Sequence, residues 1–563
     1  MGAFDNIMVS LDESLTSPLA QWNIYTTALA GLLAAGVTYA VATGVEPDTH
    51  PLRLARQSLP NMVRQEGESA FYRSAELGGG ELRRGLEVRK KGESKWARGR
   101  DGDLRDVWRA VVEGDEAGAR GKLLTIHGTE KVKEHSIEDI TRQINLIGQH
   151  ISHHGGIRVA IYLPNSIELL VTLFACSFYP NLTTILIPFD VTADSLVSML
   201  RRSAADTVIA APGTFSFDSV VKTYPALRNL IWVVDDGSAH MDWNEVPEGT
   251  GGSVNVATWR EIVDETPVDI GRELPEEGGE PKDIVTFWQG KPGTLEEMVR
   301  FTQANIVAGM AGILGSVPTN QRMGPTDVLL PADSLTSAYT LVVTLTGLFC
   351  HASVALNSVA GRSTDLVLAT QGLTPTILVA SPKSLAKIHA ESAAKLDSAI
   401  LSAAHRSLLR TLAQGALPSP TSLAARSTAS ARPALGTSPS RLRLVYVGAR
   451  ASGEDATLSE AQLADLRVFL GARIVYALTA ARVAGAVAQT WAFDYRVSGE
   501  GGGSHFGPPT VSTEIILRDS GAYKVTDEKV EGEIIAKGPA VAGGEAALGI
   551  IGRIRKDNTL ALV

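Results

Sequence analysis

The chain has 563 residues, of which 44% are hydrophobic and 20% are charged, and its formal net charge is −9 at pH 7. This length exceeds what one hydrophobic core can hold and indicates about two to four domains or subdomains. The acidic balance, with no basic face in the sequence, argues against nucleic acid as the main partner. Cys176 and Cys350 lie in apolar runs, which is typical of buried thiols rather than of a disulfide or a zinc site.

An uncharged stretch near the N-terminus, Leu19–Thr43, follows a tail of residues 1–18 and is long enough to cross a bilayer as a helix. A signal peptide fits poorly, because acidic rather than basic residues precede the stretch. A buried core helix is the alternative, since the stretch is rich in Ala, Gly and Thr. Arginines follow the stretch and none precedes it, so the positive-inside rule predicts a single anchor with the main domain in the cytosol.

Apolar strands and amphipathic helices alternate along most of the remaining chain, which predicts parallel sheets covered by helices. The first half contains predicted helices at Ser136–His150, Ile167–Tyr179 and Leu196–Ser203, and predicted strands at Val159–Leu163, Thr184–Pro188, Thr207–Ala211 and Leu230–Val234. The second half contains predicted helices at Ile306–Leu314, Leu335–Phe349, Ser384–Ala394 and Glu460–Leu470, and predicted strands at Asp327–Leu330, Ala352–Asn357, Thr376–Ala380, Arg443–Val447 and Arg473–Ala477.

The central stretch Asp283–Asn305 reads as a strand, Ile284–Trp288, then a Gly/Pro turn, then an amphipathic helix. Strand, glycine turn and helix N-terminus are the parts of a phosphate cradle, because backbone N–H groups and the helix dipole favour an anion there. Here Pro292 removes a donor, and the acidic pair Glu296-Glu297 would repel a phosphate. A solvated connecting loop is the alternative interpretation.

Two further segments differ in style from the alternating part. Residues 414–440 are rich in Ser, Ala and Pro without apolar periodicity, and we expect a flexible surface insertion there. From Thr513 onward short alternating strands predict a small β-subdomain at 513–563, which ends in an apparent hairpin at Gly552–Val563.

The order of these segments resembles the adenylate-forming (AMP-binding) superfamily, most closely its long-chain fatty-acyl-CoA synthetases. The stretches that carry the resemblance are GESAFYR, GIRVAIYLPNSIELLVTLFACSFYPNLTTILIPFD, TILVASPKSLAKIHAES, RLRLVYVGARASGE, LGARIVYALTAARVAG and GPPTVSTEIILRDSGAYKVTDEKVEGEIIAKGPAV. The resemblance implies an α/β fold with two sheet subdomains over residues 51–512, followed by the small β-subdomain and preceded by the anchor.

The family's phosphate loop reads Thr-Ser-Gly-Thr-Thr-Gly-x-Pro-Lys, and a Thr-His-x-Asn motif follows it. Thr302 and Asn305 fit the second motif, and an ungapped match then puts Gln289 at the start of the loop and Glu297 at its lysine. The resemblance therefore implies that the hydroxyls and the cation that hold ATP phosphates are lost. A shifted alignment, in which Lys291 supplies the cation, is the alternative.

Other motifs of the family are also degenerate. Its Tyr-Gly-x-Thr-Glu motif matches Tyr476–Ala480, so the glutamate that binds Mg²⁺ in the family is Ala480 here, while Tyr476 and Thr479 remain as candidates to line an adenine pocket. Its Leu-Pro-x-x-His motif ends in Ser334 instead of histidine, and its Thr-Gly-Asp motif has no counterpart. The residues expected to form a vestigial nucleotide site are Gln289, Gly290, Lys291, Gly293, Thr294, Tyr476 and Thr479.

The family's mobile C-terminal domain, which carries a catalytic lysine, would follow the last hairpin and has no counterpart in the sequence. Together these losses predict a membrane-anchored pseudo-enzyme that serves as a scaffold or as a subunit of a membrane complex, with no catalytic residue, metal or cofactor expected. A fatty acid or acyl-CoA remains a candidate ligand, and the endoplasmic reticulum is favoured over the mitochondrial outer membrane, peroxisomes and lipid droplets.

Two alternatives stay open. One is an active or weakly active long-chain fatty acid–CoA ligase that uses ATP and Mg²⁺, with another chain supplying the C-terminal domain. The other is a purely structural α/β subunit whose pocket is filled by side chains.

Overall fold

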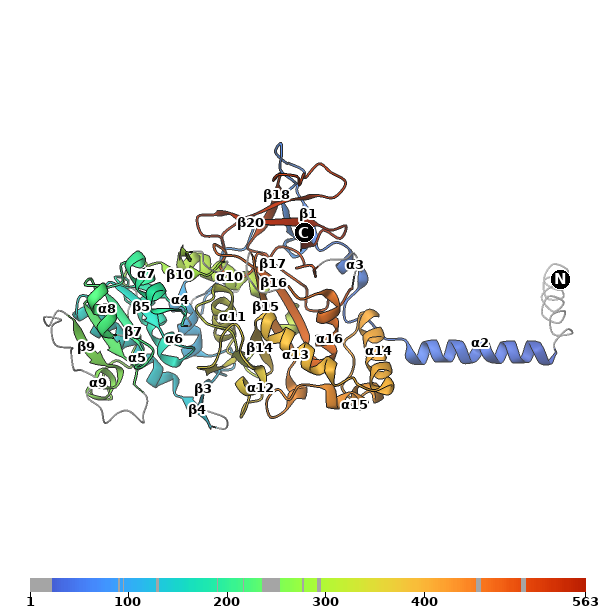
Figure 1. Cartoon of the computed structure of the whole chain (residues 1–563), viewed down its shortest axis with the longest axis horizontal. Coiled ribbons are helices and arrows are strands. Elements are labelled where there is room, and N and C mark those ends of the chain that lie inside the picture. Colours follow the sequence, from blue (N-terminus) through green and yellow to red (C-terminus); the bar gives the residue numbers. More distant parts are fainter. Residues whose placement is uncertain are drawn as a thin grey trace.

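The computed structural model describes residues 23–563 apart from 90–91, 95, 128–130, 190, 216, 235–253, 276–277, 291–294, 452–456 and 498–502. Three sheets organise this part of the chain (Figure 1). The first has seven strands in the order β11 (Glu297–Phe301), β10 (Ile284–Trp288), β6 (Thr183–Leu186), β5 (Arg158–Tyr162), β7 (Thr207–Ala210), β8 (Asn229–Trp232) and β9 (Asn255–Thr258). All neighbours in it are parallel except β10 and β11.

The second sheet has eight strands and is parallel except at its two edges. Its order is β17 (Ala488–Gln489), β16 (Arg473–Thr479), β15 (Leu444–Arg450), β14 (Ile377–Ala380), β12 (Val328–Pro331), β13 (Ser353–Asn357), β3 (Leu123–His127) and β4 (Lys131–His135). The predicted α/β fold with two parallel sheets is confirmed by these two sheets.

A layer of helices lies between the two large sheets and forms the main hydrophobic core with their facing sides. The helices of this layer are α4 (Leu104–Glu113), α5 (Ile137–His153), α6 (Ile167–Phe178), α10 (Gln303–Gly315) and α11 (Ala338–Phe349). The helices α6, α10 and α11 are apolar on nearly all faces, as expected for helices with little surface left for water, whereas α4 and α5 are amphipathic and bury one face. Trp108 of α4 is fully buried there and lies 5.0 Å from the ring of Phe174 of α6.

Helices also cover the outer faces of both sheets, which gives a layered α/β/α/β/α body. The seven-stranded sheet is covered by α7 (Ala193–Ser203) and α8 (Phe217–Thr223), with α9 (Trp259–Asp264) beside α5. The eight-stranded sheet is covered by α13 (Pro382–Ala394) and α16 (Glu460–Leu470). The remaining helical elements nearby are α12 (Leu366–Ala369), α14 (Ala399–Ala413), α15 (Leu423–Ser427), η3 (Thr319–Gln321), η4 (Ala429–Ala431) and η5 (Pro439–Arg441).

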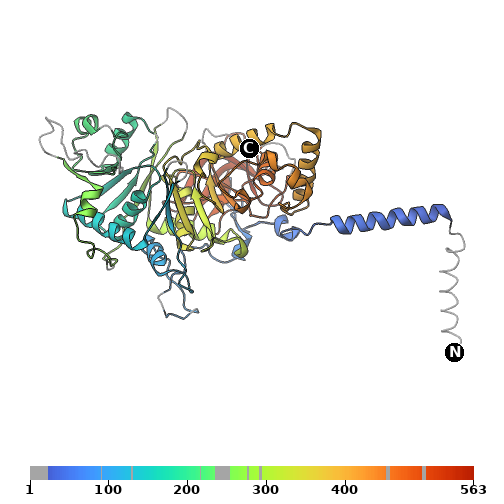
Figure 2. The same cartoon turned by 90° about the horizontal axis from the view of Figure 1, so that it is seen from below.

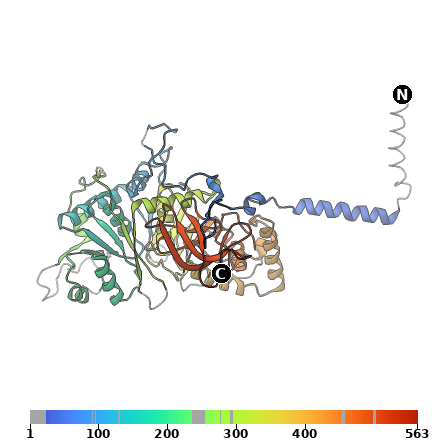
Figure 3. The same ribbon diagram turned by 90° about the horizontal axis from the view of Figure 1, so that it is seen from above.

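The third sheet is antiparallel and joins the two ends of the described chain (Figure 3). Its order is β1 (Ser58–Pro60), β2 (Tyr72–Ser74), β18 (Glu514–Arg518), β19 (Glu531–Lys537), β20 (Glu545–Ile554) and β21 (Leu560–Leu562), with η1 (Ala75–Leu77) directly after β2. The small β-subdomain expected after Thr513 therefore includes two strands from the N-terminal side.

The helix α2 (Ile24–Thr43) projects from the body, and α3 (Pro51–Ala55) follows where the chain meets it (Figures 1 and 2). Large apolar side chains of α2 are exposed, among them Tyr25 at 81% and Leu32 at 71%. Within the part of the chain that the structure describes, no helix combines the length and apolar character needed to cross a bilayer. The predicted transmembrane helix at Leu19–Thr43, whose first residues lie outside that part, is therefore not supported.

The segment 414–440, expected to be a flexible insertion without periodic structure, contains α15, η4 and the start of η5. Ala431 and Leu435 within it are buried. Its small Ala and Ser residues give no periodic apolar signal, but they allow short helical turns to pack closely against the body.

Candidate functional site

The carboxyl ends of β10, β12 and β15, together with the loop after β16, meet around one small cavity. In parallel α/β sheets ligands bind at this end of the strands. The cavity has a volume of about 80 Å³. Its described lining comprises Pro188, Phe189, Thr286, Phe287, Trp288, Gln289, Ser334, Thr336, Ser337, Ala338, Ala360, Gly361, Arg362, Arg450 and Ala481.

The turn expected to cradle phosphate connects two antiparallel strands rather than a strand and a helix. Residues Trp288 and Glu297 are paired across the hairpin, and β11 runs on to Phe301 before Thr302 caps α10. The predicted helix directly after the turn is wrong, because Met298, Val299 and Arg300 continue the strand. The positive end of the α10 dipole thus lies at the far end of the hairpin, separated from the turn by β11, and a helix dipole acts mainly within its first turn.

Of the predicted vestigial site, Gln289 lines the cavity and Gly290 follows it in the hairpin loop. Lys291, Gly293 and Thr294 lie outside the described residues. The structure therefore brings the start of the expected phosphate loop to the cavity.

The two acidic residues after the turn have basic neighbours. Glu297, at the family's lysine position, lies 2.6 Å from Nε of Arg482, which belongs to the loop after β16. Glu296 lies 3.8 Å from Arg202, whose guanidinium also donates a hydrogen bond of 2.6 Å to the Glu296 carbonyl. The acidic charge that the sequence places here is balanced by these arginines.

Two arginines that the sequence analysis did not single out line the cavity, Arg362 and Arg450. The guanidinium carbon of Arg450 lies 5.4 Å from the ring centre of Trp288, a cation–π contact between the ends of β15 and β10. The side chains of Arg450 and Trp288 occupy the space where the strand ends converge. Arg450 ends the observed β15, three residues beyond the predicted strand Arg443–Val447, so the sequence prediction did not place it at the sheet edge.

The loop after β12 is held from the other sheet by a buried asparagine. Asn165 donates to the carbonyls of Pro331 and Asp333 at 3.2 and 2.9 Å, and its Oδ1 accepts from the N–H of Leu335 at 2.8 Å. These three hydrogen bonds fix the loop that carries Ser334, the residue that replaces the family's histidine. The Ser334 hydroxyl shares a hydrogen bond of 2.8 Å with the hydroxyl of Thr336. A small hydroxyl thus stands where the family has an imidazole.

The Tyr-Gly-x-Thr-Glu counterpart does not form an open adenine pocket. Tyr476 is fully buried, stacks on Phe506 at 4.9 Å and accepts a hydrogen bond from the Leu458 N–H at 2.9 Å. Thr479 is buried and donates to the Ala449 carbonyl at 3.1 Å. Ala480 is 2% exposed and belongs to the core.

These residues do not fit ATP with Mg²⁺. Ligand pockets usually have about 300–1,000 Å³, whereas this cavity has about 80 Å³. Magnesium prefers carboxylate oxygens, and the described lining contains none.

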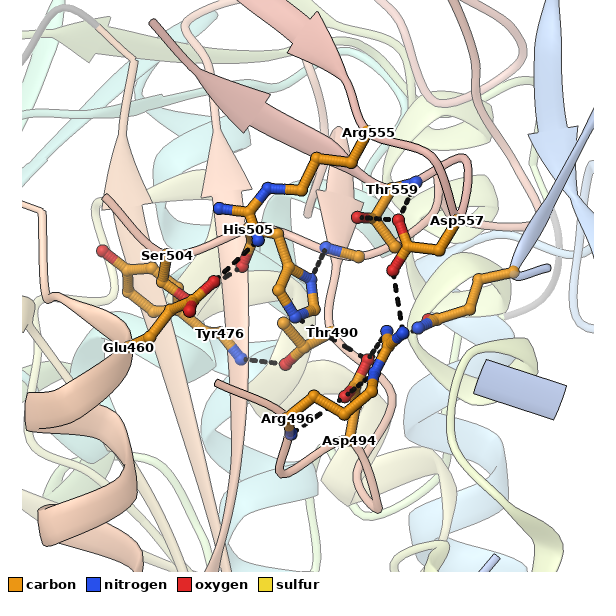
Figure 4. A network of polar contacts seen from close by, with 12 residues as sticks. Glu460, Tyr476, Thr490, Asp494, Arg496, Ser504, His505, Arg555, Asp557 and Thr559 are labelled. Carbon is orange, nitrogen blue, oxygen red and sulfur yellow. Dashed lines mark hydrogen bonds and ion pairs between the residues drawn. The ribbon is translucent and has the colours of Figure 1, made fainter. Parts of the chain in front are cut away.

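A buried polar network lies beneath the six-stranded sheet, where the N-terminal strands, the loop after β17 and the last hairpin meet (Figure 4). Asp494, with no exposed side-chain surface, accepts from Arg496 at 2.6 Å and from Nε2 of Gln57 at 2.6 Å. Arg496 also contacts Asp557 at 2.9 Å, so the network reaches the hairpin between β20 and β21. Nearby, Arg555 lies 2.6 Å from Glu460 of α16 (Figure 4).

The charges of this network are set by burial and by the arginines. Burial alone would raise the pKa of Asp494, but the hydrogen bond from Arg496, the charges of His505 and Arg496 and the hydrogen bond from Gln57 together outweigh it and lower the pKa to about 2. Burial lowers the pKa of His505, whose Nε2 lies 3.7 Å from the Asp494 carboxylate. Arg496 thus supplies the positive charge that neutralises Asp494 at neutral pH, and the network joins the small sheet to the body. Its members are far apart in the chain, so no local pattern could predict it.

No protein-family model and no curated protein sequence matches the chain. Its fold matches solved structures. An anthranilate CoA ligase, AuaEII, in complex with anthranoyl-AMP is 12% identical with a TM-score of 0.58, over 82% of this chain and 77% of that chain. The N-terminal domain of FACL13 from Mycobacterium tuberculosis, with inhibitor bound, is 14% identical with a TM-score of 0.55, over 82% of this chain and 99% of that domain.

A third neighbour, the coronafacic acid ligase from Pectobacterium brasiliense, is 14% identical with a TM-score of 0.55, over 82% of this chain and 78% of that chain. The overall fold is thus shared with these proteins over 82% of this chain at low identity. The chain has the fold of the adenylate-forming, AMP-binding superfamily.

Proposed function

We propose that the chain is an acyl-CoA-synthetase-like protein that has lost catalysis and acts as a scaffold or as a subunit of a membrane complex. One observation carries the proposal: the cavity at the converging strand ends has about 80 Å³ and is bordered by Trp288 and Arg450. Activation of a carboxylate by ATP needs preorganised cations and a metal where negative charge develops. A site too small for a triphosphate cannot preorganise those groups around it.

Calorimetric titration of ATP with Mg²⁺ into the purified chain tests this proposal. We expect no saturable heat at micromolar nucleotide, and no pyrophosphate release when palmitate and coenzyme A are added. An active long-chain acyl-CoA ligase in the same buffer serves as the positive control. Saturable micromolar binding or steady pyrophosphate release would contradict the proposal.

A second candidate function is a weakly active long-chain fatty acid–CoA ligase, and the two cavity arginines favour it. Arg362 and Arg450 are cations that could attract phosphate groups. Under this alternative, Arg450→Ala should lower pyrophosphate release from a measurable wild-type rate. Under the main proposal, wild type and Arg450→Ala both release pyrophosphate only at the rate measured without protein.

A third candidate, a purely structural α/β subunit with a filled pocket, is favoured by the same small cavity. It requires a stable assembly, so native mass measurement of the chain extracted in mild detergent distinguishes it. A strictly monomeric chain would count against this candidate, whereas a defined larger complex would support it.

Membrane association through the exposed apolar helix α2 is part of the main proposal. The helix carries no charged residue, and Leu29, Leu32 and Val37 are each at least 60% exposed. Such a surface avoids water when lipid covers it. Flotation with phosphatidylcholine vesicles tests this, with Leu32→Glu expected to reduce the floating fraction and Leu52→Glu, on exposed α3, as the matched control. Equal flotation of wild type and Leu32→Glu would refute the role of α2.

A further inference from the structure

One stretch of the chain, residues 398–443, carries six arginines and no aspartate or glutamate. The whole chain has 61 acidic against 52 basic residues, so its net charge of −9 conceals this stretch. The stretch comprises α14, α15, η4, η5 and the loops between them, and the structure describes all of it. A segment with charges of one sign creates a positive field around it, which attracts an anionic partner.

Four of the six arginines are exposed and form no ion pair within the described part of the chain, and we call them the arginine surface: Arg406, Arg410, Arg426 and Arg441. The other two differ, because Arg443 pairs with Asp327 at 2.6 Å and Arg432 is half-buried. Arg406 and Arg410 lie one turn apart on α14, where two like charges repel each other and destabilise the helix. An anionic partner across them would relieve this repulsion.

The arginine surface lies where the linker after α2 meets the body. The N–H of Asp48 in this linker donates to the carbonyl of Gly415 at 2.9 Å, shortly after Arg410 in the chain. Asp48 also accepts from Arg473, which starts β16 beside the strand that follows Arg441. Figures 1 to 3 agree with these contacts, since α14 and α15 lie at the end of the body from which α2 projects.

Asp48 fastens the linker and so keeps the arginine surface beside α2. Its carboxylate accepts from Nη2 of Arg473 at 2.9 Å and from the Tyr495 hydroxyl at 2.6 Å. Only residues 44–47 separate Asp48 from the end of α2 at Thr43, and a chain of this length spans at most about 18 Å. When α2 lies in a lipid surface, the arginine surface is therefore kept near the headgroups.

Exposed apolar side chains accompany the arginines on the same two helices. Ile400 of α14 is 77% exposed, and Leu423 of α15 is 82% exposed. Helices that combine basic and exposed apolar residues are typical of the interface between water and an anionic membrane. Asp397, before α14, and Glu46, in the linker, border the arginine surface in the chain, so cations outnumber carboxylates there. A lipid headgroup with a net negative charge fits this composition.

We propose that the arginine surface binds the anionic headgroups of the membrane with which α2 associates. This inference rests on the membrane association proposed for α2 and adds to it the class of lipid. Helix α2 carries no charged residue and is indifferent to headgroup charge, whereas each arginine near an anionic surface strengthens binding about fivefold. A preference for anionic lipid is therefore the signature of the arginine surface.

Flotation of the full chain with two kinds of vesicle tests the proposal. One kind is phosphatidylcholine alone, and the other is an equimolar mixture of phosphatidylcholine and phosphatidylserine. We expect the partition coefficient of wild type to be at least about twentyfold higher on the mixture, and the difference to vanish at about 1 M NaCl, where the Debye length is about 3 Å. Equal partitioning on both kinds of vesicle would overturn the proposal and leave the surface to an acidic protein partner.

Variants assign the preference to these residues. Arg406→Gln/Arg410→Gln removes two exposed charges, so the preference for the mixture should fall about twentyfold while partitioning on phosphatidylcholine stays unchanged. The matched control, Lys222→Gln/Arg228→Gln, changes the net charge equally at exposed positions in and after α8, at the opposite end of the body (Figure 1). Its preference for the mixture should equal that of wild type.

A second double variant, Arg426→Gln/Arg441→Gln, removes the other two charges and keeps the test decisive if the first variant does not fold. Wild-type preference in the folded double variants would place the lipid contact elsewhere and overturn the assignment. The two proposals fail in different ways. Absence of partitioning on phosphatidylcholine alone refutes the role of α2, whereas absence of a difference between the two kinds of vesicle refutes the role of the arginine surface.

Discussion

Replacing Asp494 with asparagine tests whether the buried network fastens the small sheet to the body. The variant keeps the side-chain volume but removes a carboxylate that Arg496 contacts at 2.6 Å in full burial. Breaking a buried ion pair costs about 3–5 kcal/mol. We expect the lower end, about 3 kcal/mol, because Arg496 is 35% exposed and keeps its contact with Asp557 at 2.9 Å.

The same residue predicts a pH dependence. The pKa of Asp494 is lowered from 3.8 to about 2 in the folded chain. Its contribution to stability is therefore fully present above pH 4 and is lost as the pH falls through 2, and it amounts to about 2 kcal/mol. Asp494→Asn lacks this carboxylate, so the variant should lose about that much less stability than wild type between pH 5 and pH 2.

Hydrogen exchange of the peptides that cover β20 and β21 measures the local effect. A loss of about 3 kcal/mol corresponds to about hundredfold faster exchange at pH 7, since opening of this unit would limit exchange there. Asp527→Asn, at an exposed position in the same subdomain, is the matched control and should exchange as wild type does. Exchange of Asp494→Asn within about twofold of wild type would refute the argument from burial.

Three more changes have defined outcomes. Glu297→Lys breaks an exposed ion pair with Arg482 and should change the free energy of unfolding by less than about 1 kcal/mol. It should not create ATP binding in calorimetry, and a micromolar affinity would contradict the inference that the strand-end cavity is too small for ATP. Gly309→Val places atoms against the Ala484 carbonyl and should lower stability by about 1–3 kcal/mol; an unchanged thermal midpoint would contradict that contact. Trp108→Ala empties a fully buried position and should cost about 3–5 kcal/mol, measured as a lower denaturant midpoint, whereas a cost below about 1 kcal/mol would mean that the core collapses to fill the space.

The alternating elements were predictable because their signals are local. The helix at Glu460–Leu470 has the predicted bounds, since capping and periodicity act within a few residues. The strand β11 was missed because its five residues stand directly before a strongly helical segment. The strands β1 and β2 were missed because each has only three residues and the second pairs with β18 near the other end of the chain.

The candidate site was less predictable than the fold. Motif positions such as Glu297 and Ala480 could be located from the resemblance, but the sequence gives no measure of how much space remains between them. That space depends on Arg450 meeting Trp288 across two sheets. The contact between Gln57 and Asp494 joins residues 437 positions apart, and a single sequence carries no signal for it.

The six-stranded sheet also has a consequence for synthesis on the ribosome. Arg73 of β2 lies 2.6 Å from Glu514 of β18, a residue 441 positions later. At about 5–20 residues per second, β1 and β2 wait roughly 20 to 90 seconds for their partners to be made. During that interval their backbone edges are open to other chains, so a nascent-chain chaperone that shields residues 58–74 should raise the yield of folded protein.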